Sequence, residues 1–305
     1  MTASSASSPN VRHGLNVGSV IVCYRPDRRQ LASLCEHLSS DGSRVILVDN
    51  TEPDQPGALS PSGDGQLIRV GFNSGIAHAQ NVGIGAALAA NVDVIVFFDQ
   101  DSTIHPGFLS ALLGPLNLGK PDIVSPLYLD ADSRAELPSL RVSRHGFPRA
   151  VHREGGMHPY PVDVIISSGT AATREVFAVA GNMDEALFID FVDTEWCLRC
   201  RHHQIPIRVV PTAVMHQRIG SQSVNFGVTT VLVHSPIRCY YQLRNCFHLF
   251  RRRHVPLVFA MRETLTVFLN RLLLLLIVKN KRAYVKAYAC ALRDGLKGVT
   301  GAKPA

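Results

Sequence analysis

The chain has 305 residues, of which 46% are hydrophobic, and its formal net charge is +7. This composition excludes an intrinsically disordered protein and is sufficient for one large α/β core with an appendage. The charge is uneven, because residues 236–305 hold 14 Lys and Arg but only two Asp and Glu. We therefore expect an anionic partner surface for this last segment alone.

Along the chain, short β-branched runs alternate with helical patterns. Strands are expected at 17–23, 44–49, 67–70, 92–98, 122–126, 162–166 and 207–210, and helices at 28–38 and 75–90. This alternation predicts an α/β fold with a mostly parallel central sheet flanked by helices. Residues 130–157 are rich in Arg, His, Gly and Pro and lack periodicity, which indicates an insertion or a mobile loop.

Three segments follow from this pattern, namely a flexible N-terminus at 1–16, one domain at 17–235 and a basic amphipathic helical region at 236–305. In the last segment, the most apolar stretch (272–278) is far shorter than the roughly 20 residues that span a bilayer. A helix pair over 237–297 would instead lie on an anionic membrane surface. The alternative is a helix packed on the core with a solvated basic face.

The seven cysteines form no paired framework, and residues 1–16 lack the charged and apolar blocks of a signal peptide. These features indicate a reducing, cytoplasmic location. Cys197 and Cys200 make a C-x-x-C, but no second pair of ligands completes a zinc site, so we expect ordinary helix residues. Nucleic acid is not expected as a partner, because no aromatic platform or known module accompanies the basic tail.

Two carboxylates end the apolar run 94–98, and in parallel sheets ligands bind at such strand ends. Asp99 and Asp101 lie one residue apart. Carboxylates suit a hard cation such as Mg²⁺ or Mn²⁺, which would neutralise a departing diphosphate. Two solvated acids at the start of a turn would give the same pattern.

A second acidic group opens a predicted helix, where Asp190 and Asp193 are about one turn apart. Acids here are also ordinary helix caps. The functional interpretation makes Asp193 a general base that removes a proton from an acceptor hydroxyl. His216 follows a predicted strand; a lone His is often structural, but a neutral imidazole is also a ligand for Mn²⁺-like ions.

Small residues fill the run from Asn73 to Gly83, with Asn73 and Asn81 near its ends. Such residues allow a ligand to approach the backbone closely, or serve tight helix–sheet packing. No G-x-G-x-x-G follows the first strand and no G-K-[ST] loop occurs, which argues against a dinucleotide enzyme and a P-loop nucleotidase.

Together these blocks resemble the family 2 glycosyltransferases of the GT-A fold, particularly their bacterial rhamnosyltransferase branch. The resemblance runs from about residue 17 to residue 253. It rests on ordered motifs: VCYRP at 22–26, VDN at 48–50, the small-residue run at 73–83, FDQDS at 98–102 and FIDFVDTEWCLR at 188–199. The block PIRCYYQLRN at 236–245 is also similar to that branch.

The resemblance implies a role for each matching residue. Asp193 would be the catalytic base, and Asp99, Asp101 and His216 would hold the metal, with Asp99 also meeting the substrate. Tyr24 and Asp49 would bind the nucleotide, Asn73 and Asn81 would line the same pocket, and Arg244 would meet phosphate. The further expected substrate-binding residues are Cys23, Asn50, Gly75, Ala77, Gln100, Ser168, Gly169, Glu195 and Trp196. The family usually has Thr where this chain has Cys23.

The function that the resemblance implies is inverting transfer of L-rhamnose from dTDP-β-L-rhamnose to a hydroxyl of a glycolipid or surface polysaccharide. The protein would lie peripherally on the inner face of the bacterial inner membrane. Two alternatives remain open. Residues 98–104 also match the D-x-D-x-[TV] motif of haloacid-dehalogenase-like phosphatases, with Asp99 as nucleophile, although two strand–helix units precede it here. A non-catalytic membrane-surface binding protein would leave the strand-end acids unexplained.

Overall fold

The computed structural model describes residues 14–53, 59, 65–153, 155–217, 223–225 and 230–304. The strands are β1 Val17–Cys23, β2 Arg44–Asp49, β3 Gln66–Arg69, β4 Val94–Asp99, β5 Ile123–Asp130, β6 Ser139–Val142, β7 Pro148–Val151, β8 Tyr160–Val162, β9 Ala171–Thr173, β10 Ile207–Gln217, β11 Ser223–Asn225 and β12 Thr230–Leu232. The helices are α1 Arg28–Ser40, α2 Ile76–Ala89, α3 Phe108–Leu113, α4 Arg174–Ala180, the 3₁₀ helix η1 Glu185–Leu187, α5 Val192–His202, α6 Pro236–Phe250, α7 Leu257–Ile277 and α8 Lys281–Lys297.

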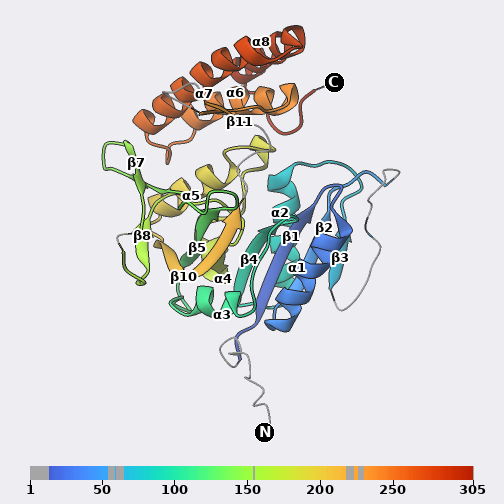
Figure 1. Cartoon of the computed structure of the whole chain (residues 1–305), viewed down its shortest axis with the longest axis vertical. Helices are drawn as coiled ribbons and strands as arrows, with labels where there is room; N and C mark the ends of the chain where they lie inside the picture. Colours follow the sequence, from blue (N-terminus) through green and yellow to red (C-terminus); the bar gives the residue numbers. More distant parts are fainter. Residues whose placement is uncertain are drawn as a thin grey trace.

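An eight-stranded sheet forms the centre of the molecule, in the order β3-β2-β1-β4-β9-β5-β10-β8 (Figure 1). Strand β1 pairs in parallel with β2 and with β4, and β5 pairs in parallel with β10. Only β8 and β9 run antiparallel to their neighbours in this sheet. The predicted α/β fold with a mostly parallel sheet flanked by helices is therefore confirmed.

Helices cover both faces of the sheet. Leucines of α1 and α3 pack with the strands on one face, and α2, α4 and α5 cover the other. The strands are apolar because both faces are buried, and β4 has five consecutive buried residues before Asp99. The Asp27 side chain caps α1 by accepting hydrogen bonds from the backbone N–H groups of Arg29 and Gln30.

The strand expected at 162–166 is wrong. The chain forms the short strand β8 and then runs outside the sheet, with a single bridge between Val164 and Leu140. This run is apolar because Val164 and Ile165 pack in the core and, with Ile166, line a cavity, and not because the three residues form a strand. The expected strand 207–210 is longer than predicted, since β10 continues past a register shift between Val210 and Val214.

The segment 130–157, expected to be an insertion or a mobile loop, contains the antiparallel hairpin β6–β7. At the N-terminus, residues 1–13 lie outside the described residues. Asn16, which was included in the expected flexible segment, is held: its N–H donates to Asp93 Oδ2 at 2.9 Å, and its amide donates to the carbonyls of Ala90 and Asn91. Residues 218–222, which follow shortly after His216, also lie outside the described residues.

The basic segment folds into three helices, α6 to α8, and not into the expected pair. They form a separate layer above the sheet domain in Figure 1. Ser235 caps α6 with Pro236 in its first turn, and Gly298, whose φ of 76° suits glycine, caps the C-terminus of α8. None of the helices that the structure describes is both long and apolar enough to cross a bilayer.

Candidate active site

The ends of β1 and β4 are joined side by side at one edge of the sheet. Gln100, directly after β4, accepts a hydrogen bond from the Tyr24 N–H at 2.6 Å and donates to the Tyr24 carbonyl at 3.1 Å. Next to it, Gln30 of α1 donates to the Asp101 carbonyl at 2.7 Å. These bonds hold Asp99 and Asp101 at the carboxyl end of the sheet, where the strand-end rule predicts a ligand.

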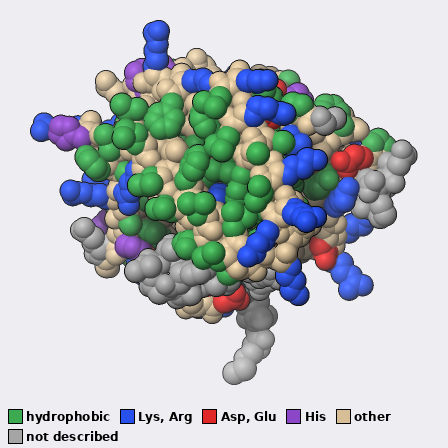
Figure 2. Space-filling view, turned by 90° about the horizontal axis from the view of Figure 1, so that it is seen from above, with side chains coloured by type: hydrophobic (Ala, Val, Ile, Leu, Met, Phe, Trp, Pro, Cys, Tyr) green, Lys and Arg blue, Asp and Glu red, His purple; other side chains and the backbone are tan. Residues whose placement is uncertain are grey.

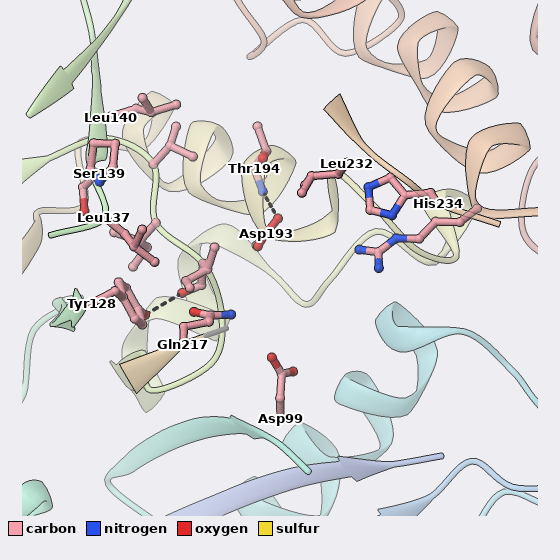
Figure 3. A pocket seen from close by; sticks show the side chains of 15 residues that line it. Asp99, Tyr128, Leu137, Ser139, Leu140, Asp193, Thr194, Gln217, Leu232 and His234 are labelled. Atoms are coloured by element: carbon pink, nitrogen blue, oxygen red, sulfur yellow. Dashed lines mark hydrogen bonds between the residues drawn. The ribbon is translucent and has the colours of Figure 1, made fainter. Parts of the chain in front are cut away.

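Two adjoining cavities open at this edge and share Asp99 and Gln217 in their walls. The larger, of about 680 Å³, has Asp99 on one side and Asp193 on another (Figure 3). The smaller, of about 300 Å³, is lined by Asp99, Asp101, Ser168 and His216. The structure therefore brings together the acids of β4, the acid of α5 and the imidazole of β10, which are far apart in the sequence.

Burial and charge act together on Asp99. Burial first, and then the carboxylates of Asp101 and Asp193, raise the pKa of Asp99 to about 6, although Ser168 and Arg238 oppose the shift. Burial also raises the pKa of Asp193, against a hydrogen bond from the Thr194 N–H at 2.8 Å. A cavity in which carboxylates repel one another is suited to a cation or to the proton of a substrate.

The raised pKa of Asp99 predicts a stability change. Between its ordinary value of 3.8 and about 6 the folded state binds the proton more tightly, so folding stability falls as the pH rises through this window. Asp99→Asn should therefore raise the free energy of unfolding by about 1–3 kcal/mol at pH 8 and by much less at pH 4. Urea unfolding in EDTA measures this. Glu36→Gln, at an exposed side chain of α1 that lines neither cavity, is the control, and an equal gain in both variants would contradict the explanation.

The smaller cavity contains the donor types for a divalent cation, two carboxylates and one imidazole. Burial, followed by Arg134 and His105, lowers the pKa of His216, so the ring is neutral as a ligand must be. His216 Nε2 is now hydrogen-bonded to the Arg134 guanidinium. In the described parts of the chain, no three His, Cys, Asp or Glu side chains already stand close enough to hold a metal ion. The residue types fit Mg²⁺ or Mn²⁺, and binding requires these side chains to turn toward one another.

A strained turn leads into Asp193. Phe188, Asp190 and Phe191 have φ values of 64–65°, which are unusual for residues with a side chain. The Phe188 carbonyl accepts a hydrogen bond from Ile76 N–H at 2.8 Å, at the start of α2. An added Cβ at Gly75 would lie 2.6 Å from Phe188, so Gly75 serves this close contact. The turn thus joins the start of α2 to the segment that leads into Asp193.

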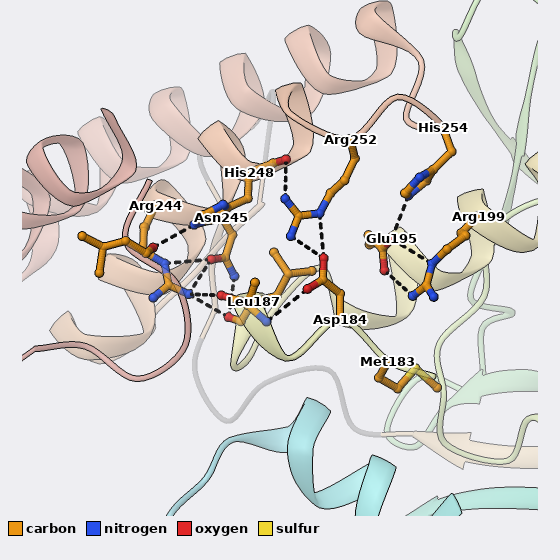
Figure 4. Close-up of polar contacts among 12 residues, drawn as sticks. Met183, Asp184, Leu187, Glu195, Arg199, Arg244, Asn245, His248, Arg252 and His254 are labelled. Carbon is orange, nitrogen blue, oxygen red and sulfur yellow. Dashed lines mark hydrogen bonds and ion pairs between the residues drawn. The ribbon is translucent and has the colours of Figure 1, made fainter. Parts of the chain in front are cut away.

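Arg244 and Asn245 of α6 hold this turn, and the two residues before it, through hydrogen bonds to backbone carbonyls (Figure 4). Arg244 donates to the carbonyls of Ala186, Leu187 and Gly301 at 2.6–3.1 Å. Asn245 donates to the carbonyls of Leu187, Ile189 and Asp190 at 2.8–3.0 Å. The expected phosphate contact of Arg244 is wrong, because the side chain is fully buried and its donors are directed at these carbonyls.

Glu195 and Trp196 also have packing roles and not the expected substrate contacts. Glu195 is 1% exposed and forms a bidentate pair with Arg199, while His254 Nε2 lies 2.7 Å from its Oε1 (Figure 4). Burial alone would raise the pKa of Glu195, but hydrogen bonds from His254 and Arg199 outweigh it and hold the pKa below its usual value. Trp196 stacks on Phe177 and donates to the Gly181 carbonyl.

Several smaller expected contacts are replaced by packing. The Asn81 amide donates hydrogen bonds to the Met183 carbonyl and to Glu185 Oε1, and it accepts one from the Met183 N–H. These bonds join α2 to the chain just before the turn. Cys23 and Ala77 are completely buried in the two core clusters. Gly169, with a φ of 80°, has Met215 and Pro126 where a Cβ would stand. In the described parts of the chain, these residues support the site but line neither of its two cavities.

The expected nucleotide-binding residues cluster at the end of β2. Asp49 is 2% exposed, and its two oxygens accept from the N–H groups of Thr51 and Leu59. Asn50 accepts from Ser74 N–H and Oγ, and its amide donates to Asn73 Oδ1 at 3.3 Å. Asp49 is thus buried, with each oxygen accepting a hydrogen bond from a backbone N–H, whereas Tyr24 and Asn73 keep partly exposed side chains. The nucleotide contacts stay predictions.

Residues that the motifs did not single out complete the larger cavity. Arg238, in the first turn of α6, is the one Lys or Arg in its described lining and is paired with Asp190 at 3.1 Å. Tyr128 donates to the Ser168 carbonyl at 2.6 Å, and Leu137 and Leu140 form an apolar wall. Arg238 lies in the matched block 236–245, but nothing in that block distinguishes its role from that of Arg244.

Comparisons with known proteins identify the family. The model of the family "Glycosyl transferase family 2" matches residues 20–177. The dTDP-rhamnosyl transferase RfbF of Shigella flexneri is 38% identical over 94% of this chain and 97% of its own length. This favours a glycosyltransferase over the phosphatase interpretation of Asp99.

Solved structures share the fold. The crystal structure of GalNAc-T7 with UDP, GalNAc and Mn²⁺ matches 68% of this chain with a TM-score of 0.55 at 14% identity, and this chain spans only 44% of that one. The crystal structure of S. aureus TarS 1-349 matches 93% of this chain, and 81% of its own, with a TM-score of 0.54 at 13% identity. At such identities the likeness concerns the fold alone. The family match and the Shigella relative together establish that this chain belongs to glycosyl transferase family 2.

Proposed function

We propose that this protein transfers L-rhamnose from dTDP-β-L-rhamnose to a hydroxyl of a glycan or a lipid-linked acceptor, with inversion, to give an α-L-rhamnoside. The observation that carries the proposal is that Asp99 and Asp193 both line one cavity of about 680 Å³. The 38% identity with a dTDP-rhamnosyl transferase supports the choice of donor.

The reaction is a single displacement. Asp193 accepts the proton of the acceptor hydroxyl, the oxygen forms a bond to the anomeric carbon, and the bond from that carbon to the diphosphate oxygen breaks. The products are the rhamnoside and dTDP. The partly buried position of Asp193 on the cavity wall and the raised pKa of its carboxyl favour proton uptake from a hydroxyl.

The leaving diphosphate needs positive charge. Asp101, His216 and Asp99 would hold Mg²⁺ or Mn²⁺, which supplies neutralising charge to the diphosphate oxygens when bound. Arg238 is the guanidinium in the cavity wall, and we assign to it the phosphate contact expected of Arg244. Its side chain is 47% exposed, so it can exchange Asp190 for a phosphate oxygen.

The wall of the larger cavity fits a 6-deoxy sugar. Rhamnose has a methyl group where glucose or galactose has a hydroxymethyl group. Leu137, Leu140 and Ile166 line the cavity that holds both catalytic-site acids. An apolar wall accepts the methyl group of rhamnose, whereas the hydroxymethyl group of glucose or galactose would find no hydrogen-bond partner there.

The test of the donor is a panel of nucleotide sugars. Purified protein with Mn²⁺ and a glycolipid extract should release nucleoside diphosphate from dTDP-β-L-rhamnose (as dTDP) at least about tenfold faster than from dTDP-glucose (as dTDP) or UDP-GlcNAc (as UDP). Proton NMR of the product should show an α-linked rhamnosyl residue. Equal rates with all donors would contradict the rhamnose assignment, and turnover of phosphate esters without any sugar nucleotide would contradict glycosyl transfer.

Metal removal is a second test. EDTA should reduce dTDP release by at least about a hundredfold, and Mn²⁺ should restore it. In a direct readout, Asp101→Ala should weaken Mn²⁺ binding measured by electron paramagnetic resonance. The control Glu36→Gln removes an exposed carboxylate of α1 and should bind Mn²⁺ as the parent protein does. Full activity in EDTA would show that Asp99, Asp101 and His216 have another role.

The proposed place of action is the inner face of the bacterial inner membrane, with an anionic membrane surface as partner. The basic charge of residues 236–305 supports this, as do the seven cysteines, which are all free thiols in the structure. An acceptor with a lipid anchor would be met at this surface.

A further inference from the structure

Helix α7 turns a row of large apolar side chains outward. Leu257, Met261, Leu265, Leu269, Leu272 and Leu276 follow one another at intervals of three or four residues, so they share one face of the helix. We call them the α7 stripe. Each is 51–68% exposed, while Phe259, Ala260 and Leu274 pack inward. A contiguous exposed apolar surface of this kind marks an interaction site.

Basic side chains border the α7 stripe. Figure 2 shows this face of the molecule, with apolar side chains gathered over its middle and Lys and Arg along its margin. On the neighbouring helix, exposed cations are Lys281, Arg282, Lys286, Arg293 and Lys297. Of the two acids in residues 236–305, Asp294 is buried. The face therefore combines an apolar centre with a cationic rim.

We propose that the α7 stripe is a monotopic membrane anchor that lies in the surface of an anionic phospholipid bilayer. The leucines would enter the boundary between headgroups and acyl chains, and the basic rim would contact lipid phosphates. A second copy of the chain is a poorer occupant, because two such faces would place their cationic rims against each other. The helix lies on the bilayer and does not cross it, since Arg262, Glu263 and Arg271 interrupt its apolar sequence.

The anchor is joined to the wall of the active-site cavity. Arg262 of α7 donates to the Pro148 carbonyl of the β6–β7 hairpin at 2.6 Å. At the tip of the hairpin, an added Cβ on Gly146 would lie 2.7 Å from the Pro256 Cβ, so the two segments are in close contact. Ser139 and Leu140 of the same hairpin line the larger cavity. Docking of α7 would thus hold the cavity wall close to the bilayer, which suits the lipid-linked acceptor of the proposed function.

The test compares two variants with the same change in charge. Leu265→Glu places a carboxylate in the α7 stripe, and Thr266→Glu places one at the next, also exposed position, which is turned by about 100° around the helix. Each full-length protein is mixed with vesicles of phosphatidylcholine containing about 30 mol % phosphatidylglycerol, and with phosphatidylcholine alone, and is separated by flotation. Light scattering gives the oligomeric state without lipid, and dTDP release measures donor turnover.

Wild-type protein should float with the anionic vesicles and at least about tenfold less with the neutral ones. Leu265→Glu should lower the bound fraction at least about tenfold, and Thr266→Glu less than about threefold. The proposal is overturned if both variants bind alike, or if wild type is a dimer that Leu265→Glu makes monomeric without any vesicle binding. Vesicle binding without turnover of dTDP-rhamnose would overturn the proposed function alone, and turnover without vesicle binding would overturn the anchor alone.

Discussion

Replacing Asp193 by Asn is expected to lower kcat for rhamnosyl transfer by about a thousandfold, while donor affinity changes by less than about threefold. The amide has the shape of the carboxylate but cannot take the proton of the acceptor hydroxyl. The Thr194 N–H, which donates to Asp193 Oδ1 at 2.8 Å, can donate to the amide oxygen, so the position of the side chain is preserved. Initial rates of dTDP release and calorimetric titration with donor measure the two quantities.

The control for this variant is Glu36→Gln, which makes the same chemical change at an exposed position of α1 and should leave kcat unchanged. If Asp193→Asn transfers rhamnose at the wild-type rate, Asp193 is not the base. If it loses donor affinity as strongly as kcat, the side chain binds the donor and does not act in proton transfer.

The pH profile offers a second measurement on the same residue. Since burial raises the pKa of Asp193, the carboxylate becomes protonated, and inactive as a base, at a higher pH than an ordinary aspartate. Asp99, with a pKa of about 6, is also protonated on this side of neutrality. We therefore expect kcat/KM of the wild-type protein to fall as the pH is lowered through about 6. In Asp193→Asn only Asp99 still becomes protonated, so the residual kcat/KM of this variant should fall less over the same pH range.

Local patterns in the sequence were sufficient for the parallel strands of the sheet and for the acids at the end of β4. The β4 run is apolar for five residues and then changes to Asp99, which identifies both the strand and its functional end. Strand β9 could not be predicted in the same way. It has three residues and runs antiparallel between β4 and β5, so its place depends on partners more than 45 residues away in the chain.

Residue type alone does not separate a binding side chain from a packing one. Arg244 and Arg238 stand in the same helix six residues apart, but one is fully buried among carbonyl groups and the other faces a cavity. Apolar character has the same ambiguity, because residues 164–166 are apolar as a cavity wall and not as a strand. Both distinctions arise from tertiary packing, which single-sequence patterns do not contain.

Arg244 should be indispensable for a different reason from Asp193. Arg244→Met buries no charge but removes the donors to the carbonyls of Ala186, Leu187 and Gly301, of which only Leu187 keeps another donor, the Asn245 amide. We expect the free energy of unfolding to fall by about 3 kcal/mol, with the exposed Arg253→Met as matched control near zero. Urea unfolding of both variants provides the comparison.

The activity of the folded Arg244→Met protein separates a positioning role from a purely structural one. Arg244 and Asn245 hold the strained turn whose residues Phe188, Asp190 and Phe191 have positive φ, and this turn sets the position of Asp193. A displacement of about 1 Å lowers rates by up to about a hundredfold. We therefore expect kcat per folded molecule to fall at least about tenfold, with little change in the KM for the donor, at a temperature where unfolding curves show the variant fully folded. An unchanged kcat would mean that the turn keeps its strained shape without Arg244, and that Asn245 with the contact between Phe188 and α2 is enough to place the base.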